Sequence, residues 1–116
     1  MQPGLPKLLE DIRDAAAFIL ASTSGRTLAQ FRSDRLLCQA VERNFEIIGE
    51  AILRIVRSDP EAAARLGDVK RIIGFRNILI HGYDIVDREV VWLVVQDDLP
   101  RLLAAVEALL ADAGPA

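Results

Sequence analysis

Apolar residues recur three and four positions apart along most of the chain, which is the spacing of amphipathic helices. The pattern predicts a first helix from Leu5 to Ala21, followed by a loop of small and polar residues at 22–25. A second, long helix is predicted from an N-cap at Ser33 to Arg57. Its apolar positions form two stripes, which favours packing on more than one side: Leu37, Val41, Phe45, Ile47, Ile48, Ala51, Ile52 and Ile55.

Gly49 lies in the interior of this long helix. Glycine at such a position costs roughly 1 kcal/mol in helix propensity relative to alanine. We therefore expect Gly49 to be needed for the close approach of a neighbouring helix.

Two further helices are predicted in the second half of the chain. Asp59 and Pro60 have the residue types of an N-cap and a first helical position, and the short helix that they begin is expected to stop at Gly67. Asp68 is the predicted N-cap of the next helix, which is expected to end at Gly82.

The last predicted helix begins after an N-cap at Asp87 and reaches Leu110, with a kink where Pro100 removes a backbone donor. No segment has a useful strand pattern, and the sequence contains no internal repeat. We therefore expect an all-α, up-and-down bundle of four to five helices. The expected organisation is a single domain over residues 1–116, with a frayed tail from about 112 to 116.

Composition and charge narrow the function. The chain has 116 residues, 52% of them hydrophobic, and a net charge of −3, which argues against a protein that coats nucleic acid non-specifically. The balance is reversed locally, because residues 62–81 contain one acidic side chain and four basic ones, namely Arg65, Lys70, Arg71 and Arg76.

Several classes of site and location are disfavoured. Cys38 is the only cysteine, so neither an internal disulfide nor a cysteine-based metal site is expected, and its apolar neighbours predict a buried side chain. No apolar run is long enough for a membrane helix, and Pro3, Glu10 and Asp11 stand where a signal peptide would have its apolar core. We expect a cytoplasmic protein.

The residues with the clearest chemical potential lie together at 76–83. Arg76, Asn77 and the only histidine, His81, are followed by the only tyrosine, Tyr83. Histidine transfers protons near neutral pH, and arginine stabilises charge on phosphate oxygens. The group suits cleavage of a phosphodiester by an internal hydroxyl without a metal or cofactor, since one histidine with only Asp84 and Glu50 as further candidates is a poor metal-ligand set. A capping histidine and a surface arginine are the structural alternative.

A helical wheel of this segment separates a core face, made of Ile72, Phe75, Ile78 and Leu79, from a polar face. Ile73 and Ile80 fall on the polar side, where either a partner subunit or another helix of the same chain can cover them. Because acid–base catalysis needs two groups and each chain has one histidine, we expect a symmetric homodimer that brings two copies of Arg76 and His81 into one cleft.

The segment Arg76–Tyr83 resembles the signature of the HEPN superfamily, in which an arginine and a polar residue precede a histidine. Tyr83, two residues after the histidine, is the variant similar to the HepT toxin ribonucleases. The similarity covers roughly residues 7–110, because further segments resemble the second and the last helix of that family: Ala40–Ala51, Val86–Trp92 and Asp98–Pro100.

The resemblance implies a dimeric helical bundle with metal-independent endoribonuclease activity. Arg76 and His81 are then the essential catalytic residues and Asn77 supports them. Glu46 and Glu50 on the long helix are possible cleft residues, which either pair with Arg76 or lie at the edge of the core.

The resemblance also implies the toxin of a type VII-like toxin–antitoxin system. Its partner would be an MntA-like minimal nucleotidyltransferase antitoxin, which inactivates the toxin by transferring AMP to Tyr83 (AMPylation). The alternatives are a non-catalytic helical module that only binds such a partner, and a structural bundle. A packing tyrosine is the alternative for Tyr83.

Overall fold

The computed structural model describes residues 4–113, apart from the side chains of Tyr83 and Ala113, and these residues form only helices and their connections. The expectation of an all-α fold is confirmed. The expected frayed tail falls partly on residues 114–116, which lie outside the described residues. The elements are α1 (Leu5–Thr23), α2 (Leu28–Ser33), α3 (Arg35–Ser58), α4 (Pro60–Arg65), α5 (Lys70–His81), the 3₁₀ turn η1 (Tyr83–Ile85), α6 (Arg88–Leu93), the π-helical segment η2 (Val94–Asp98) and α7 (Leu99–Ala113).

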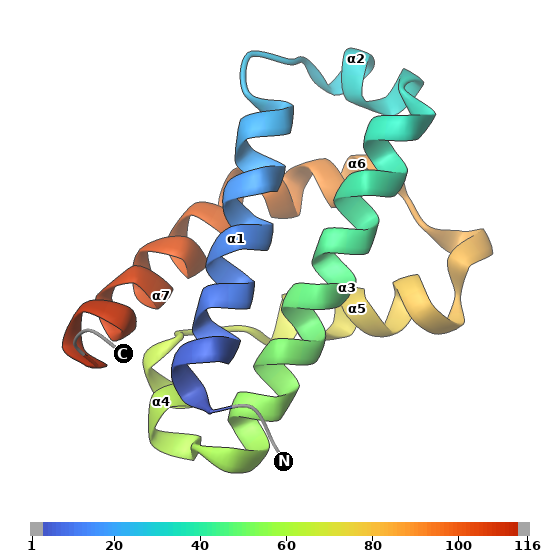
Figure 1. The fold of residues 1–116 in the computed structure, drawn as a ribbon. Helices are drawn as coiled ribbons and strands as arrows, with labels where there is room; N and C mark the ends of the chain where they lie inside the picture. Colours follow the sequence, from blue (N-terminus) through green and yellow to red (C-terminus); the bar gives the residue numbers. More distant parts are fainter. Residues whose placement is uncertain (1–3, 114–116) are drawn as a thin grey trace.

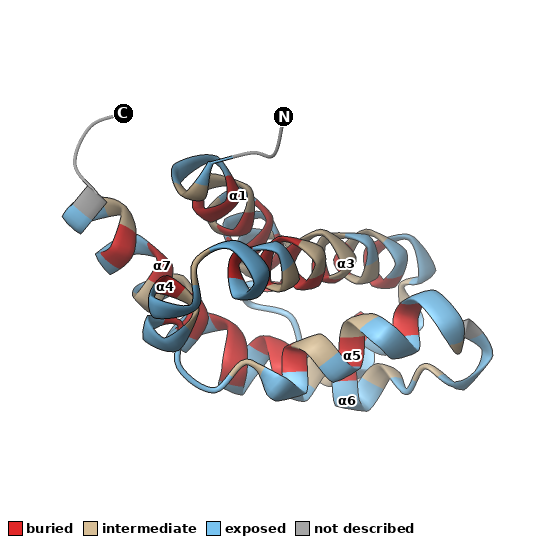
Figure 2. Ribbon diagram, turned by 90° about the horizontal axis from the view of Figure 1, so that it is seen from below, coloured by how far each residue is buried: buried red, intermediate tan, exposed pale blue. Residues whose placement is uncertain are grey.

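Helices α1 and α3 form an antiparallel pair at the centre of the molecule (Figure 1). Helix α7 packs on α1, and α5 crosses α3. Buried residues face inward between α1, α3 and α7, whereas the outward side of α5 is exposed (Figure 2). The stripes predicted on the long helix account for much of this core, because Val41, Phe45, Ile48, Ile52 and Ile55 have no exposed surface.

The start of the long helix differs from its prediction. Ser33 is not its N-cap, because residues 28–33 form the separate helix α2, which Thr27 and Gln30 begin with a capping box. Asp34 caps α3 instead, and its carboxylate accepts a hydrogen bond from the backbone N–H of Leu37 at 3.0 Å. The expected N-cap was therefore wrong by one residue, since two polar residues in succession both fit the pattern.

The short helix begins as predicted, with Asp59 accepting from the N–H of Ala62 and Pro60 at the first position. The cap of α5 was predicted less accurately. Val69 occupies the N-cap. Asp68, the residue before it, accepts a side-chain hydrogen bond from the backbone N–H of Lys70. The end of α5 before Gly82 agrees with the prediction.

Asp87 accepts from the N–H of Glu89 and begins the last helical stretch, as predicted. A kink was expected at Pro100, and the helix is interrupted there by the π-helical segment η2. In this segment the N–H of Leu99 donates to the carbonyl of Val94. A wider π turn gives room for the proline ring, and the chain changes direction between α6 and α7 (Figure 1). No helix within residues 4–113 has the length and apolar character that crossing a membrane requires.

Candidate functional site

Arg76 is held against α3 at the one place where that helix lacks a side chain. A Cβ built on Gly49 would lie 2.5 Å from the Cγ of Arg76, far inside van der Waals contact. The absence of a side chain at Gly49 therefore lets the aliphatic stem of Arg76 lie directly on the backbone of α3. This confirms the expected close approach of a neighbouring helix and identifies that helix as α5.

Two hydrogen bonds orient the Arg76 guanidinium. Its Nη2 donates to Oε2 of Glu50 at 2.9 Å, and its Nη1 donates to Oδ1 of Asn77 at 3.0 Å. The Nε atom is buried and has no hydrogen-bond partner. Of the two pairings considered for the acidic residues of α3, the one between Glu50 and Arg76 is therefore present.

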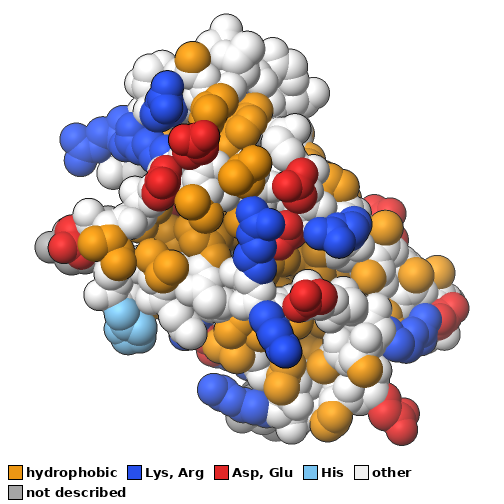
Figure 3. Space-filling model, turned by 180° about the vertical axis from the view of Figure 1, so that it is seen from behind, with side chains coloured by type: hydrophobic (Ala, Val, Ile, Leu, Met, Phe, Trp, Pro, Cys, Tyr) orange, Lys and Arg blue, Asp and Glu red, His pale blue; other side chains and the backbone are white. Residues whose placement is uncertain are grey.

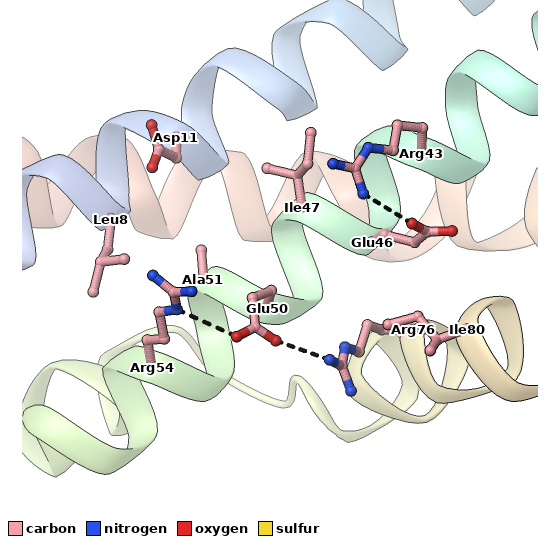
Figure 4. Close-up of a pocket in the computed structure, with 10 residues that line it drawn as sticks. All are labelled: Leu8, Asp11, Arg43, Glu46, Ile47, Glu50, Ala51, Arg54, Arg76 and Ile80. Atoms are coloured by element: carbon pink, nitrogen blue, oxygen red, sulfur yellow. Dashed lines mark hydrogen bonds and ion pairs between the residues drawn. The ribbon is translucent and has the colours of Figure 1, made fainter. Parts of the chain in front are cut away.

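Glu46 and Glu50 belong to one pocket of about 470 Å³ between α1, α3 and α5 (Figure 4). Glu46 accepts from Arg43 at 3.1 Å rather than from Arg76, and the second oxygen of Glu50 accepts from Nε of Arg54 at 3.2 Å. The complete lining is Leu8, Asp11, Arg43, Glu46, Ile47, Glu50, Ala51, Arg54, Arg76 and Ile80.

Side chains of both charges line the pocket (Figure 4). They are three arginines and three carboxylates. Arg43 pairs with Glu46, Arg54 and Arg76 share Glu50, and the third carboxylate, Asp11, pairs with Lys7 outside the lining. The two hydrogen bonds of the Arg76 guanidinium leave one N–H free on each terminal nitrogen. The pocket can therefore bind a phosphate group beside the Glu50 carboxylate.

Arg43 and Arg54 were not predicted as pocket residues. A signal for Arg54 was present, because Glu50 and Arg54 are four residues apart on a predicted helix and such pairs interact. The helix pattern carried no information about which neighbouring helix this pair would meet.

His81 lies apart from the pocket within one chain. It is the last residue of α5, its side chain is exposed, and it is not among the lining residues. The histidine, pale blue in Figure 3, protrudes at the edge of the molecule in that view. The structure therefore brings Arg76, Asn77 and Glu50 together but leaves His81 at the surface of the same helix.

Tyr83 begins η1 immediately after Gly82, but its side chain lies outside the described residues. The expectation for its hydroxyl consequently stays a prediction. Its backbone position places it next to the exposed end of α5.

The predicted core face of α5 is confirmed at Ile72, Phe75 and Leu79, which are buried. Ile78 was wrongly placed there, since it is 42% exposed. The core lies on one side of α5 only, and Ile78 is rotated beyond the reach of α3. Of the two isoleucines on the polar side, Ile73 packs partly on the core of its own chain, whereas Ile80 is 41% exposed.

Glu42, another acidic residue of α3, has a shifted pKa. Burial raises the pKa of the Glu42 carboxyl, with Arg88 opposing the shift and Glu46 adding to it. Burial likewise raises the pKa of the Cys38 thiol, which is an inert core residue as expected. Within the described residues, no three His, Cys, Asp or Glu side chains are close enough together to hold a metal ion.

The fold and the pocket thus define an all-helical protein in which one helix carries an arginine held in a pocket and, at its exposed end, a histidine. Comparison with protein families identifies it further, because residues 9–109 match the family described as Ribonuclease HepT-like. The chain belongs to this family, and it is an enzyme of the endoribonuclease class.

Individual relatives agree with the family assignment. A protein of Methanocaldococcus jannaschii named as a candidate RNase is 33% identical over 99 residues, which is 85% of this chain and 90% of the relative. One of Caldanaerobacter subterraneus, also named as a candidate RNase, is 30% identical over 88% of this chain and 90% of its own length. One of Thermococcus cleftensis, named as a candidate ribonuclease HepT, is 36% identical over 87% and 91%. No solved structure matches the chain significantly.

Proposed function

We propose that this chain is a toxin that cleaves RNA without a metal, in a site formed by two copies of the chain. The observation that carries the proposal is the position of Arg76. Its guanidinium lies in the pocket and has N–H donors left for a phosphate. His81 supplies the proton transfer, and Asn77 orients the guanidinium from the same helix.

The proposed reaction uses the substrate's own nucleophile. The RNA 2′-hydroxyl attacks the adjacent phosphorus, its proton passes to one imidazole, and the bond from phosphorus to the 5′-oxygen breaks as a second imidazolium protonates that oxygen. The products are a 2′,3′-cyclic phosphate and a 5′-hydroxyl. Arg76 stabilises the negative charge that grows on the non-bridging oxygens.

The need for both a base and an acid supports the dimer. One chain has one histidine, at the exposed end of α5 beside the exposed Ile80. In the proposed dimer, Ile80 lies at the interface, with Ile73 at its edge, and each chain's α5 contributes its His81 to a shared cleft.

Substitution of the two catalytic residues tests the proposal. We expect Arg76→Ala to lower cleavage of an oligoribonucleotide by about 10²–10³-fold and His81→Ala by about 10²–10⁴-fold. Lys70→Ala is the matched control, since it removes a positive charge from the exposed first turn of the same helix. Cleavage and growth arrest that persist at the native level in both Arg76→Ala and His81→Ala would leave the non-catalytic, partner-binding module as the better account.

Regulation is proposed to act on Tyr83 through an MntA-like nucleotidyltransferase antitoxin. The Tyr83 hydroxyl attacks the α-phosphorus of ATP, pyrophosphate leaves, the phenolic proton passes to a base of the antitoxin, and an AMP ester of tyrosine remains. The added negative charge, two residues from His81, would repel an RNA phosphate. Family membership and the position of Tyr83 two residues after the end of α5 support this assignment.

Mass spectrometry tests the modification directly. After incubation with ATP, magnesium and a nucleotidyltransferase partner, we expect the peptide that contains Tyr83 to gain one AMP group and the protein to lose activity. Tyr83→Phe should gain no AMP and should stay active. Equal labelling of the Tyr83→Phe variant would refute the acceptor role.

A further inference from the structure

We propose that Glu50 is a positioning residue that fixes the Arg76 guanidinium in the orientation that receives the RNA phosphate. This inference deepens the proposed function and rests on it. The Glu50 carboxylate lies in the pocket where a polyanionic substrate is expected to bind, so its presence there needs a reason.

The Glu50 carboxylate is itself held in place by a second arginine. Arg54, one helical turn further along α3, donates to Oε1, which leaves Oε2 to accept from Arg76 on α5 (Figure 4). A carboxylate that is fixed from its own helix has few alternative orientations. The shared carboxylate therefore acts as a rigid link between α3 and the guanidinium.

The count of donors on Arg76 favours positioning over blocking. A guanidinium has five N–H donors, one on Nε and two on each Nη. Nε is buried without a partner, Nη1 gives one donor to Asn77, and Nη2 gives one to Glu50. One N–H on each terminal nitrogen remains, which is the number that a two-point contact with phosphate uses.

Charge is also consistent with this role. Glu50 carries one negative charge between two arginines, so the group of Arg54, Glu50 and Arg76 keeps a net positive charge. The Arg76 side chain is 20% exposed and that of Glu50 is 39% exposed, so the pair is partly shielded from water and less screened than a surface pair. The site thus keeps attraction for phosphate while its arginine is held still.

Glu46 is a matched control on the same helix. It lies one turn before Glu50 in the same pocket, but it pairs with Arg43, whose side chain is 70% exposed, and makes no contact with Arg76. Any effect of removing an acid from an RNA-binding pocket is therefore shared by both residues. Only Glu50 adds an effect on the orientation of Arg76.

The steady-state constants of cleavage separate these effects. We expect Glu50→Ala to lower kcat at least ten-fold while KM for an oligoribonucleotide stays the same or falls, because a repelling charge is removed at the same time. Glu50→Gln should lose less kcat, since its amide oxygen still accepts one hydrogen bond. Glu46→Gln gives the effect of removing a pocket acid alone, and Glu50→Ala should have the lower kcat of the two. A kcat of Glu50→Ala at or above the wild-type value would overturn the proposal and would identify the contact as autoinhibitory.

A spectroscopic measurement needs no substrate. ¹H–¹⁵N correlation spectra measure the rate at which the buried Nε–H of Arg76 exchanges with solvent. We expect slow exchange in the wild-type protein, exchange at least ten-fold faster in Glu50→Ala, and the native rate in Glu46→Gln. Equal exchange in wild type and Glu50→Ala would refute the positioning role. If exchange responds as expected while cleavage is insensitive to Arg76→Ala, the proposed function fails and the structural link stands.

Discussion

Arg76 and Gly49 together determine the geometry of the site. The arginine supplies the charge, and the glycine supplies the space in which its stem lies against α3. An arginine side chain in solution has many rotamers, and holding it in one orientation is what makes it effective toward a transition state. The glycine is thus as specific a requirement of the site as the arginine itself.

Gly49→Ala should disable the site by displacing Arg76. The new Cβ would overlap the Arg76 stem close to its backbone, so α5 must shift. We expect a loss of about 1–3 kcal/mol in the free energy of unfolding and a fall in cleavage. Urea denaturation and an RNA cleavage assay measure both effects.

Gly74→Ala on α5 is the control for this substitution. Nothing lies within 4 Å of a Cβ built there, so the helix propensity of alanine should raise stability by up to about 1 kcal/mol with unchanged cleavage. Equal free energies of unfolding for Gly49→Ala and Gly74→Ala would contradict the account of Gly49.

Glu42 should make stability depend on pH in a defined direction. Because burial raises its pKa, the folded state binds the proton more tightly than the unfolded chain does. The stability that this contributes is fully present below the ordinary value of 4.5 and is lost as the pH rises through the raised pKa. Glu42→Gln should therefore have a higher urea midpoint than wild type at pH 7 and the same midpoint at pH 4. The exposed Glu107→Gln should change the midpoint equally little at both values.

The sequence predicted those features of the site that depend on the chemistry of a single residue. The close approach at Gly49 follows from the missing side chain of glycine, and the pairing of Glu50 with Arg76 follows from the opposite charges of the two side chains. The exposure of Ile78 could not be predicted, because a helical wheel gives an angle around one helix but not the position of its neighbours.

The predicted starts of the helices differ from the structure more than any other predicted feature of the helices. Ser33 and Asp34 are adjacent and both are favourable N-caps, but only one can have the extended backbone that precedes α3. Helix α2 ends at Ser33 and turns the chain, so the cap falls on Asp34. Six residues of α2 are too few to produce a clear apolar period, which is why this helix was not predicted.

Substitution of the two adjacent residues tests the assignment of the cap. Asp34→Ala should lower the free energy of unfolding by about 1 kcal/mol, because the N–H of Leu37 loses its acceptor. Ser33→Ala should change it by less than about 0.5 kcal/mol, since the Ser33 hydroxyl donates only to the carbonyl of Gln30. Thermal unfolding would contradict the structure if Ser33→Ala were the more damaging change.

At the scale of the whole molecule, the pocket and the histidine do not meet within one chain. Arg76 faces the pocket between α1, α3 and α5, while His81 is exposed where α5 ends. A second copy of α5 is the simplest source of the missing acid or base. The single histidine of the sequence predicts this second copy, and the exposed position of His81 supports it.

A charged substitution at Ile80 tests the predicted dimer interface. Ile80→Asp should convert a dimer into a monomer of 12.8 kDa in light scattering, because a carboxylate would be buried without a partner. Val56→Asp is the control, as Val56 is equally exposed but lies near the far end of α3. A dimer that persists in Ile80→Asp would place the interface elsewhere.

The most direct test of the two-chain site is to dilute the active chain with an inactive one. Wild-type protein is unfolded and refolded with a nine-fold excess of the Arg76→Ala/His81→Ala chain, and RNA cleavage is measured per wild-type chain. If each site needs both chains, random pairing should lower this activity to about a tenth. Activity per wild-type chain that is unchanged by the inactive excess would contradict the account.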